Sequence, residues 1–494
     1  MRREYTPKNN IKRNYLCGYL TVYTALSMMI LLSLCLTLIE GARRNTIRLE
    51  AECIMDIALN SVLAEYHREL YQQYNLLFID TSYGSGVPSY YSTAAHLLEY
   101  ANKNMRTDDI FLSGFLYRDI LAMSAASAEV SKVSVATDLN GGIFRERAVE
   151  AIKNDVGITY LEEVVKWLDV VELNDLSGRN IREEKESVDA SIQEYDGEEV
   201  LISESEWTAV EINNPTKNLD QKRSAPILSL VVADNSSLSR AAADLSALYS
   251  TRQGNGTVNR GSLKTEQGDE GVIEKLLFQE YMLRYAGYYG KELDKSLLKY
   301  QIEYLIAGKD NDQDNLESVV NQISALREVA NAVYLFSDSE KCALAEAVAA
   351  ALAAAIFLPE IAPLLQAAII LGWAYAESLY DIKVLLAGGK VPLLKTAENW
   401  HYDISCVFEE TAAEDVESGE MGLSYQDYLR ILLMLQNTET VNYRFFDIVE
   451  MDIRITKGNA AFRLDGCIDG MEALLNIESA YGYQCVITRQ KEYY

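Results

Sequence analysis

An uncharged stretch near the start of the chain constrains its fold more than any other feature. Residues 16–39 contain no charged side chain over 24 positions. A helix rises about 1.5 Å per residue, so this stretch extends for about 36 Å and can cross a hydrocarbon core of about 30 Å. Charged residues mark both ends: Arg2, Arg3, Lys8, Lys12 and Arg13 precede it, and Glu40, Arg43, Arg44 and Arg48 follow it. The sequence therefore predicts a single-pass transmembrane helix that anchors the chain in a cell membrane.

The distribution of basic residues predicts the orientation of this anchor. Five basic residues precede the stretch and three follow it closely. Because basic residues are retained in the cytoplasm, we expect residues 1–15 inside the cell and the bulk of the chain to be extracytoplasmic. The alternative is a cleaved secretory signal, which has an apolar core of about 7–15 residues followed by small residues. Here the core is longer and runs into Glu40-Gly41-Ala42-Arg43, so we expect an uncleaved anchor.

The acidic balance of the chain argues against nucleic acid as a partner. The net charge is -28, and residues 1–48 hold eight basic and two acidic residues. The remainder therefore carries a net charge of -34, which phosphates would repel. With 49% hydrophobic residues, the whole chain has enough apolar side chains for a packed core.

Cysteine and histidine are too scattered to indicate a metal or redox site. No Cys-x-x-Cys pair occurs among the seven cysteines, and the three histidines are far apart in the sequence. Cys467 and Cys485 lie in successive apolar segments, so they either form a disulfide in an oxidising compartment or remain buried thiols. We expect no cofactor.

The hydrophobic periodicity predicts an α+β fold that is predominantly helical. The membrane helix should continue outward as an amphipathic helix. Helices are expected over residues 42–73, 91–105, 144–171, 272–288, 315–336, 337–357, 361–386, 424–436 and 444–453, and strands over residues 76–79, 128–139, 294–307, 470–480 and 483–489. Residues 343–375 are apolar enough to suggest a second membrane span, but two glutamates and two prolines interrupt this region, which favours a buried helical hairpin.

Composition shifts divide the chain into segments. Residues 173–271 are acidic and polar with few large apolar side chains, which is typical of a linker or insertion with only a short ordered segment. The expected order is a cytoplasmic N-terminus (1–15), the transmembrane helix (16–39), a long helix plus an α+β region (40–172), the insertion (173–271) and a mainly helical domain ending in strands (272–494).

The N-terminal block resembles the prepilin-like proteins of tight-adherence (Flp pilus) loci, the TadE/TadG-like group. The matching features are the basic leader, Gly18 before Tyr19-Leu20-Thr21-Val22-Tyr23, and Glu40-Gly41-Ala42-Arg43 after the span. The resemblance implies a pilin-like helix whose apolar residues bind neighbouring pilin helices or lipid. These contact residues are Leu20, Val22, Leu26, Ile30, Leu31 and Leu38.

The same resemblance implies a leader-processing junction between Gly18 and Tyr19, where a pilin peptidase would cut. The family carries Glu five residues beyond that glycine, and this chain has Tyr23 there. Without this carboxylate, the new terminal amine would lack a partner in a setting of low dielectric, where an unpaired charge is costly. We therefore expect the leader to be retained and the protein to stay in the membrane.

Four later segments resemble an uncharacterised family of exported proteins that Gram-positive bacteria encode beside such pilus genes. The segments are AEYHRELYQQYNLLFIDTSYG (64–84), YQIEYLIAGKDNDQDNLESVV (300–320), WAYAESLYDIKVLLAGGKVPLLK (373–395) and LSYQDYLRILL (423–433). Because that family has no assigned activity, the resemblance implies an association with pilus genes but no particular reaction or ligand.

One turn offers a candidate site for a divalent cation. The run from Asp80 to Ser85 is similar to the metal-dependent adhesion site of von Willebrand A-type domains, which TadG-like proteins can carry. That site holds Mg²⁺ through a carboxylate and two hydroxyls, and the matching residues here are Asp80 and Ser82. Gly84 stands where the second serine would be. The alternative, which we favour, is a polar turn in which Asp80 and Ser82 bond nearby backbone amides.

Tyrosine is abundant, with 32 tyrosines against 11 phenylalanines, and one cluster includes Tyr481 and Tyr483. Such clusters form either partner surfaces or the half-buried rim of a core.

Together these observations predict a non-enzymatic minor pseudopilin-like or accessory component of a tight-adherence pilus or secretion apparatus. The expected partners are membrane lipid and pilin or pilus-assembly proteins, the latter in a hetero-oligomer. The alternative is a membrane-tethered extracellular adhesion domain that uses a divalent cation. A third class, an extracellular hydrolase, has only dispersed acids such as Asp447 and Glu450 in its favour.

Overall fold

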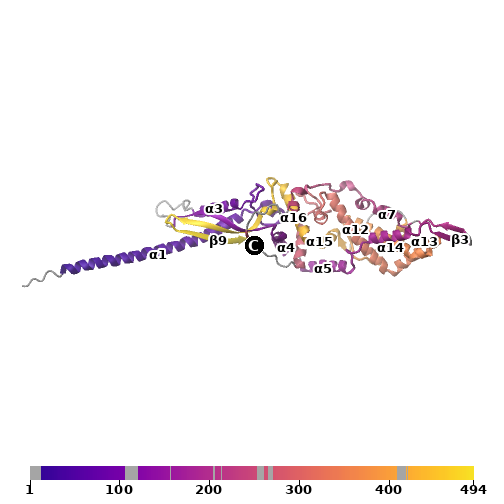
Figure 1. Cartoon of the computed structure of the whole chain (residues 1–494), viewed down its shortest axis with the longest axis horizontal. Helices are drawn as coiled ribbons and strands as arrows, with labels where there is room; N and C mark the ends of the chain where they lie inside the picture. The colour runs from indigo at the N-terminus through magenta and orange to yellow at the C-terminus, as the bar shows by residue number, and fades with distance from the viewer. Residues whose placement is uncertain are drawn as a thin grey trace, which may run out of the picture.

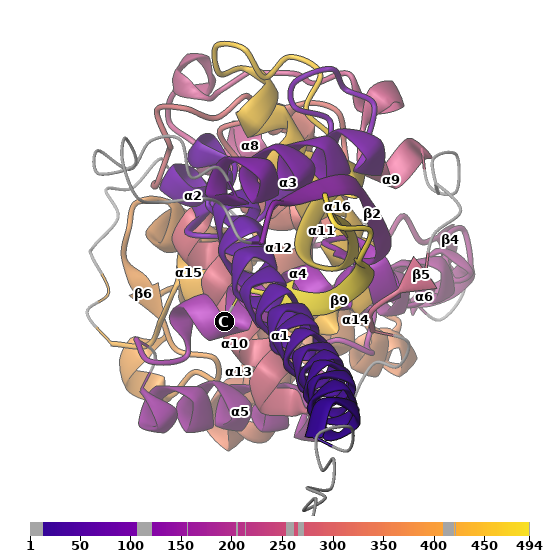
Figure 2. The same ribbon diagram turned by 90° about the vertical axis from the view of Figure 1, so that its left-hand side faces the viewer.

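The computed structural model describes residues 13–105, 121–155, 157–203, 206–212, 214–252, 261–264, 271–408, 419 and 421–493. These residues form an α+β protein that is predominantly helical, as the sequence predicts. Figure 1 shows an elongated molecule, in which α1 (Arg13–Leu63) projects from one end and β3 (Glu199–Ser203) lies at the other. In Figure 2, α1 points toward the viewer and the helical body lies behind it.

A single continuous helix joins the apolar stretch to the folded body. With 51 residues, α1 is about 76 Å long. Its side chains from Tyr19 to Ile39 are exposed apart from the half-buried Ser27, whereas its second half buries one face. The buried residues follow the helical repeat and are Ile47, Ala51, Ile54, Met55, Ala58, Leu59, Val62 and Leu63. The helix therefore has one part that packs within the chain and one part that does not.

The buried face of α1 packs against a mostly antiparallel sheet. Its strands are β1 (Ile79–Asp80), β2 (Met123–Val135), β5 (Gly261–Ser262), β8 (Cys467–Ser479) and β9 (Gln484–Glu492). The order is β1-β8-β2-β5, and β9 pairs with β8. Side chains of α1, α3 (Tyr90–Met105), β2 and β8 share one core.

The C-terminal strands thus complete a sheet that begins near residue 79, far from them in the sequence. The sheet thus joins the expected α+β region 40–172 to the last strands of the mainly helical domain expected over 272–494. Strand β2 needs a partner for its backbone hydrogen bonds, and the antiparallel register Met123↔Ser479 to Val135↔Ile468 shows that β8 supplies it. Pairing between such distant segments leaves no local signal in the sequence.

Six cysteines are free thiols: Cys35, Cys53, Cys342, Cys406, Cys467 and Cys485. Cys467 pairs with Asp80 and Cys485 with Ile477 in the sheet. Positions 467 and 477 lie at opposite ends of β8, about 33 Å apart at about 3.3 Å per residue. Because a disulfide needs Cα atoms within about 7 Å, Cys467 and Cys485 do not pair.

The helical body surrounds the buried helix α14 (Ala362–Leu386). Its main neighbours are α12 (Asp312–Ser337) and α13 (Ser339–Ala355), and the body also holds α10 (Val272–Tyr285), α11 (Gln301–Ala307), α15 (Tyr425–Leu435) and α16 (Thr438–Arg454). Among the described residues, two helices are long and apolar enough to cross a membrane, Tyr19–Leu63 and Pro359–Leu386. No residue of the apolar window of the first is buried, whereas 72% of the window of the second is buried. The expected burial thus holds for α14, whereas α13 buries only Ala345, Ala349 and Ala353.

The acidic segment 173–271 is more ordered than the sequence predicts. Its described part holds α6 (Ile181–Gln193), β3, β4 (Glu206–Ala209), α7 (Lys217–Arg223), α8 (Ile227–Val231) and α9 (Tyr249–Arg252). Its helices bury apolar residues in the core, among them Ile181, Ile192 and Leu219. The interpretation as a linker was wrong here because a small number of apolar side chains suffices when they all lie on one face of a helix.

Several expected elements differ in extent or type. The helix expected over 42–73 ends at Leu63, and α2 (Arg68–Tyr74) starts afresh after His67, whose Nδ1 accepts a hydrogen bond from the Leu70 N–H. The helix expected over 144–171 is divided into α4 (Asp138–Ile152) and α5 (Ile158–Leu173). The strand expected over 294–307 is wrong, since its second half is α11. There Gln301 to Ile306 are all buried, so no alternation separates helix from strand.

Candidate functional site

The exposed half of α1 carries the residues that the resemblance implies as contacts. Their side chains are between 54% and 70% exposed, and they are Leu20, Val22, Leu26, Ile30, Leu31 and Leu38. Large apolar side chains in such a continuous run are normally covered by a partner or by lipid. The structure brings none of the described residues of this chain over these six side chains.

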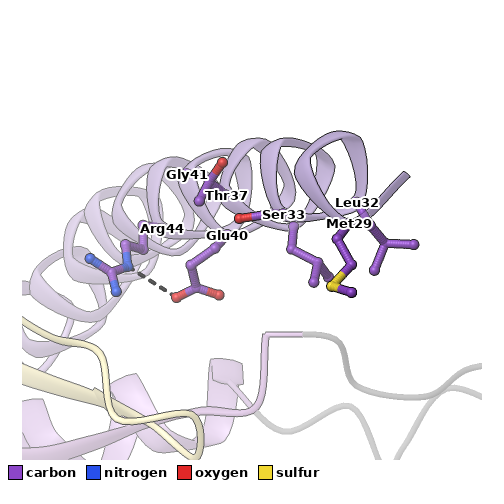
Figure 3. A pocket seen from close by; sticks show the side chains of 8 residues that line it. Met29, Leu32, Ser33, Thr37, Glu40, Gly41 and Arg44 are labelled. Atoms are coloured by element: carbon purple, nitrogen blue, oxygen red, sulfur yellow. Dashed lines mark hydrogen bonds and ion pairs between the residues drawn. The ribbon is translucent and has the colours of Figure 1, made fainter. Parts of the chain in front are cut away.

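An open hollow of about 690 Å³ lies along one side of this part of α1 (Figure 3). Small residues line its middle once per turn, at Ser33, Thr37 and Gly41. Arg44 and Glu40 close its outer end, with Arg44 Nε donating to Glu40 Oε1 at 3.0 Å. The lining of the hollow is therefore mostly apolar, with charged side chains at one end. This pattern suits a helix that passes from a lipid phase into water at this level.

The predicted processing junction lies inside α1. Gly18 is helical, and the side chain of Tyr19 is 81% exposed. The side chain of Tyr23, where the resembling family has a carboxylate, is also exposed and belongs to the same apolar surface.

The candidate cation ligands Asp80 and Ser82 form a closed local turn. One carboxylate oxygen of Asp80 accepts from the Ser82 N–H at 2.8 Å and the other from the Ser82 hydroxyl at 2.9 Å. The neighbouring Thr81 hydroxyl donates to the Gly466 carbonyl at 2.7 Å. In the part of the chain that the structure describes, no group of three His, Cys, Asp or Glu residues is placed to hold a metal ion. The geometry therefore matches the polar-turn interpretation.

A polar cluster that the sequence did not reveal lies where α1 ends. The carboxylate of Glu65 contacts His96 Nδ1 at 2.9 Å and accepts hydrogen bonds from the Tyr100 hydroxyl at 2.6 Å and the Tyr83 hydroxyl at 3.2 Å. An open hollow of about 420 Å³ adjoins it and is lined by Asp80 among others. The only indication of this cluster in the sequence is the four-residue spacing of His96 and Tyr100, which places both side chains on one face of α3. These bonds fix the end of α1 against α3.

A second cluster is a buried network of two cations and two carboxylates in the helical body. Arg327 Nε lies 3.0 Å from Asp381 Oδ2, and Lys395 Nζ lies 2.6 Å from Asp381 Oδ1. Lys395 also pairs with Glu377, which accepts from the backbone N–H groups of His401 and Tyr402 at 3.0 and 2.9 Å. The charges balance and every carboxylate oxygen has a donor. This network therefore holds α12, α14 and the segment after residue 390 together.

The acids of α16 are also committed to separate structural partners. Asp447 accepts from the Tyr304 hydroxyl at 2.8 Å, whereas Glu450 pairs with Arg252 and Arg454 at 2.5 and 2.6 Å. Both carboxylates are fully buried. Each carboxylate is therefore engaged by its own set of partners.

Comparison with known proteins places more than half of the chain in one family. A family of unknown function, DUF5702, matches residues 205–479. The chain belongs to the DUF5702 family. No curated protein and no solved structure matches the chain.

The DUF5702 region and the exposed half of α1 are separate parts of the chain. The region runs from the hairpin at the far end of the molecule to the last residue of β8, and it contains the whole network of Arg327, Glu377, Asp381 and Lys395. The exposed span precedes it. Three of the four segments quoted from the sequence, 300–320, 373–395 and 423–433, lie within the DUF5702 region.

Proposed function

We propose that the protein is a membrane-anchored, non-enzymatic minor pseudopilin-like or accessory component of a tight-adherence pilus or secretion apparatus. The observation that carries this proposal is the division of α1 into an exposed apolar half and a half that packs on a sheet. A helix built in this way can lie among lipids or other helices at one end while it carries a folded body at the other.

The proposal includes an orientation. Residues 1–15 lie in the cytoplasm, and the acidic body is extracytoplasmic, in agreement with the excess of basic residues before the span. The partners are membrane lipid and pilin or assembly proteins that contact Leu20, Val22, Leu26, Ile30, Leu31 and Leu38. The leader before Tyr19 is retained, because Tyr23 offers no carboxylate to a new terminal amine.

The rival proposal, an adhesion domain that binds a divalent cation at Asp80, has less support. Both oxygens of that carboxylate are already engaged by Ser82. Calorimetry with Mg²⁺, Mn²⁺ and Ca²⁺ on the full chain in detergent tests it, since binding that disappears in Asp80→Ala would favour the rival.

Site-specific photo-cross-linking in cells tests the main proposal. Leu49 is 66% exposed and lies just beyond the span, so p-benzoylphenylalanine at this position can reach a neighbouring subunit. The matched control is Trp207, which is 62% exposed in the hairpin at the opposite end of the molecule. We expect adducts with a pilin or an assembly-platform protein from position 49 and not from position 207. Adducts that contain neither class of protein would count against the proposal.

A further inference from the structure

The tip of the β8–β9 hairpin docks on α1 just beyond the end of the apolar span. The Arg43 guanidinium lies 3.3 Å from the centroid of the Tyr481 ring, and its Nη2 donates to the Ser479 hydroxyl at 3.2 Å. Arg44 lies 5.5 Å from the Tyr483 ring. Cation–π contacts of this kind hold the two aromatic rings against the helix. The folded body therefore reaches along α1 to residue 43 and leaves no bare stalk.

The distance from the span sets the depth of this contact. Arg43 is four residues beyond Ile39, which is about 6 Å along the helix axis. The headgroup layer on each side of a bilayer is about 5–7 Å thick. With residues 16–39 across the hydrocarbon core, Tyr481 and Tyr483 lie at headgroup depth, where tyrosine is enriched because its ring is apolar and its hydroxyl is polar.

The segment of α1 at this level carries a positive charge, although the neighbouring hairpin carries the exposed Glu478. Arg43, Arg44 and Arg48 face only Glu40 between residues 40 and 48, whereas the chain after residue 48 carries a net charge of -34. Glu40 pairs with Arg43 and Arg44, and Arg48 contacts Glu52 at 3.4 Å. The side chains of Arg44 and Arg48 remain 56% and 68% exposed, so each guanidinium keeps donors for a phosphate.

We propose that Arg44 and the hairpin tip Tyr481–Tyr483 bind the phosphate headgroups of anionic phospholipid, and that Arg48, one turn further from the membrane, adds attraction to the anionic surface. Arg43 is the positioning residue that holds the tip in place. This inference rests on the proposed membrane anchor and deepens it. A second attachment beside the span would fix the rotation of the elongated body about α1 and would offset the repulsion between the acidic body and the membrane.

Three tyrosine positions, each replaced by p-benzoylphenylalanine in the full chain, test the depth of the hairpin tip. The protein is reconstituted into vesicles of phosphatidylcholine and phosphatidylglycerol in equal parts, and lipid adducts are measured by mass spectrometry. Tyr23 lies in the span, Tyr481 at the hairpin tip, and Tyr91 is 85% exposed at the start of α3. The other end of α3 lies toward the tip, because Asn102 bonds to Ala125 near the start of β2.

We expect lipid adducts from positions 23 and 481 and none from position 91. Adducts from position 23 without any from position 481 would overturn this inference and leave the anchor intact. No adduct from position 23 would overturn the proposed anchor, and this inference with it.

The charge is tested by the yield of adducts from position 481. The double variant R44Q/R48Q should lower this yield about tenfold in the mixed vesicles, because each arginine near an anionic surface contributes attraction. The control R182Q/K217Q removes the same charge from exposed positions of the body and should leave the yield unchanged. Equal yields from both variants, or suppression of the adducts by added inorganic phosphate, would refute the assignment to lipid headgroups.

Discussion

Lys395 offers the sharpest test of how the helical body is held together. Its Nζ lies between the carboxylates of Glu377 and Asp381, and the three side chains are 2%, 0% and 1% exposed. In Lys395→Met the side chain becomes one atom shorter and loses its charge. Two buried carboxylates then face the single cation of Arg327. Loss of one partner from a buried ion pair costs about 3–5 kcal/mol, because the remaining charge has neither water nor a counter-ion.

A double variant separates this electrostatic cost from a loss of packing. In E377Q/K395M the amide carbonyl introduced at position 377 can accept from only one of the His401 and Tyr402 N–H groups, which bond different oxygens of Glu377, but Arg327 and Asp381 remain as one balanced pair. We therefore expect the double variant to regain about half or more of the lost stability, a coupling of about 2 kcal/mol.

Urea unfolding of the full chain in detergent provides the measurement, with tryptophan fluorescence as the probe. The Lys395 ammonium lies 5.6 Å from the Trp400 ring, so the transition near the network is visible. Lys103→Met is the control, since Lys103 forms an exposed pair with Glu99 on α3 and its loss should not shift the transition. The reasoning is refuted if K395M unfolds at the same urea concentration as the wild type, or if the double variant is no more stable than K395M.

Three further outcomes are expected. Burial raises the pKa of Glu303 from 4.5 to about 7, so its folded form holds a proton that the unfolded form has released; stability from this group is complete below about pH 4.5 and falls by about 3 kcal/mol as the pH rises to 7. Glu303→Gln should remove this part of the pH dependence in urea titrations at several pH values, and an unchanged slope would contradict the burial argument. Gly141→Ala should destabilise by about 2–4 kcal/mol, because φ is +83° and a Cβ would overlap the Phe446 ring. Gly84 has φ +85° and open space around it, so Gly84→Ala measures the cost of the backbone conformation alone. Equal urea midpoints for the two variants would show that the overlap with Phe446 does not contribute to the loss of stability. Mass spectrometry of the membrane-purified protein should detect the leader, and a peptide that begins at Tyr19 would instead favour a filament subunit.

The sequence alone determined the elements whose cause is local. The apolar stretch 16–39 required a helix that no described part of the chain covers, because an unbroken run of this length has no polar face to turn toward water. Periodicity fixed α3, α12 and α14 to within a few residues, since the helical repeat repeats its signal over several turns. The closed turn at Asp80 also follows from neighbours two residues apart.

Tertiary structure decided everything that depends on partners distant in the sequence. The residues of α11 are nearly all buried, so their sequence has no alternation that would distinguish a helix from a strand. Only the tertiary structure shows that they form a helix. The pairing of β2 with β8 and the contact of Arg43 with Tyr481 each join segments that are hundreds of residues apart. Only the folded chain brings Glu377 and Asp381 to either side of Lys395. The physical reason is that a buried charge is stable only with its counter-charge, and the counter-charge is supplied by the fold and not by the neighbouring residues.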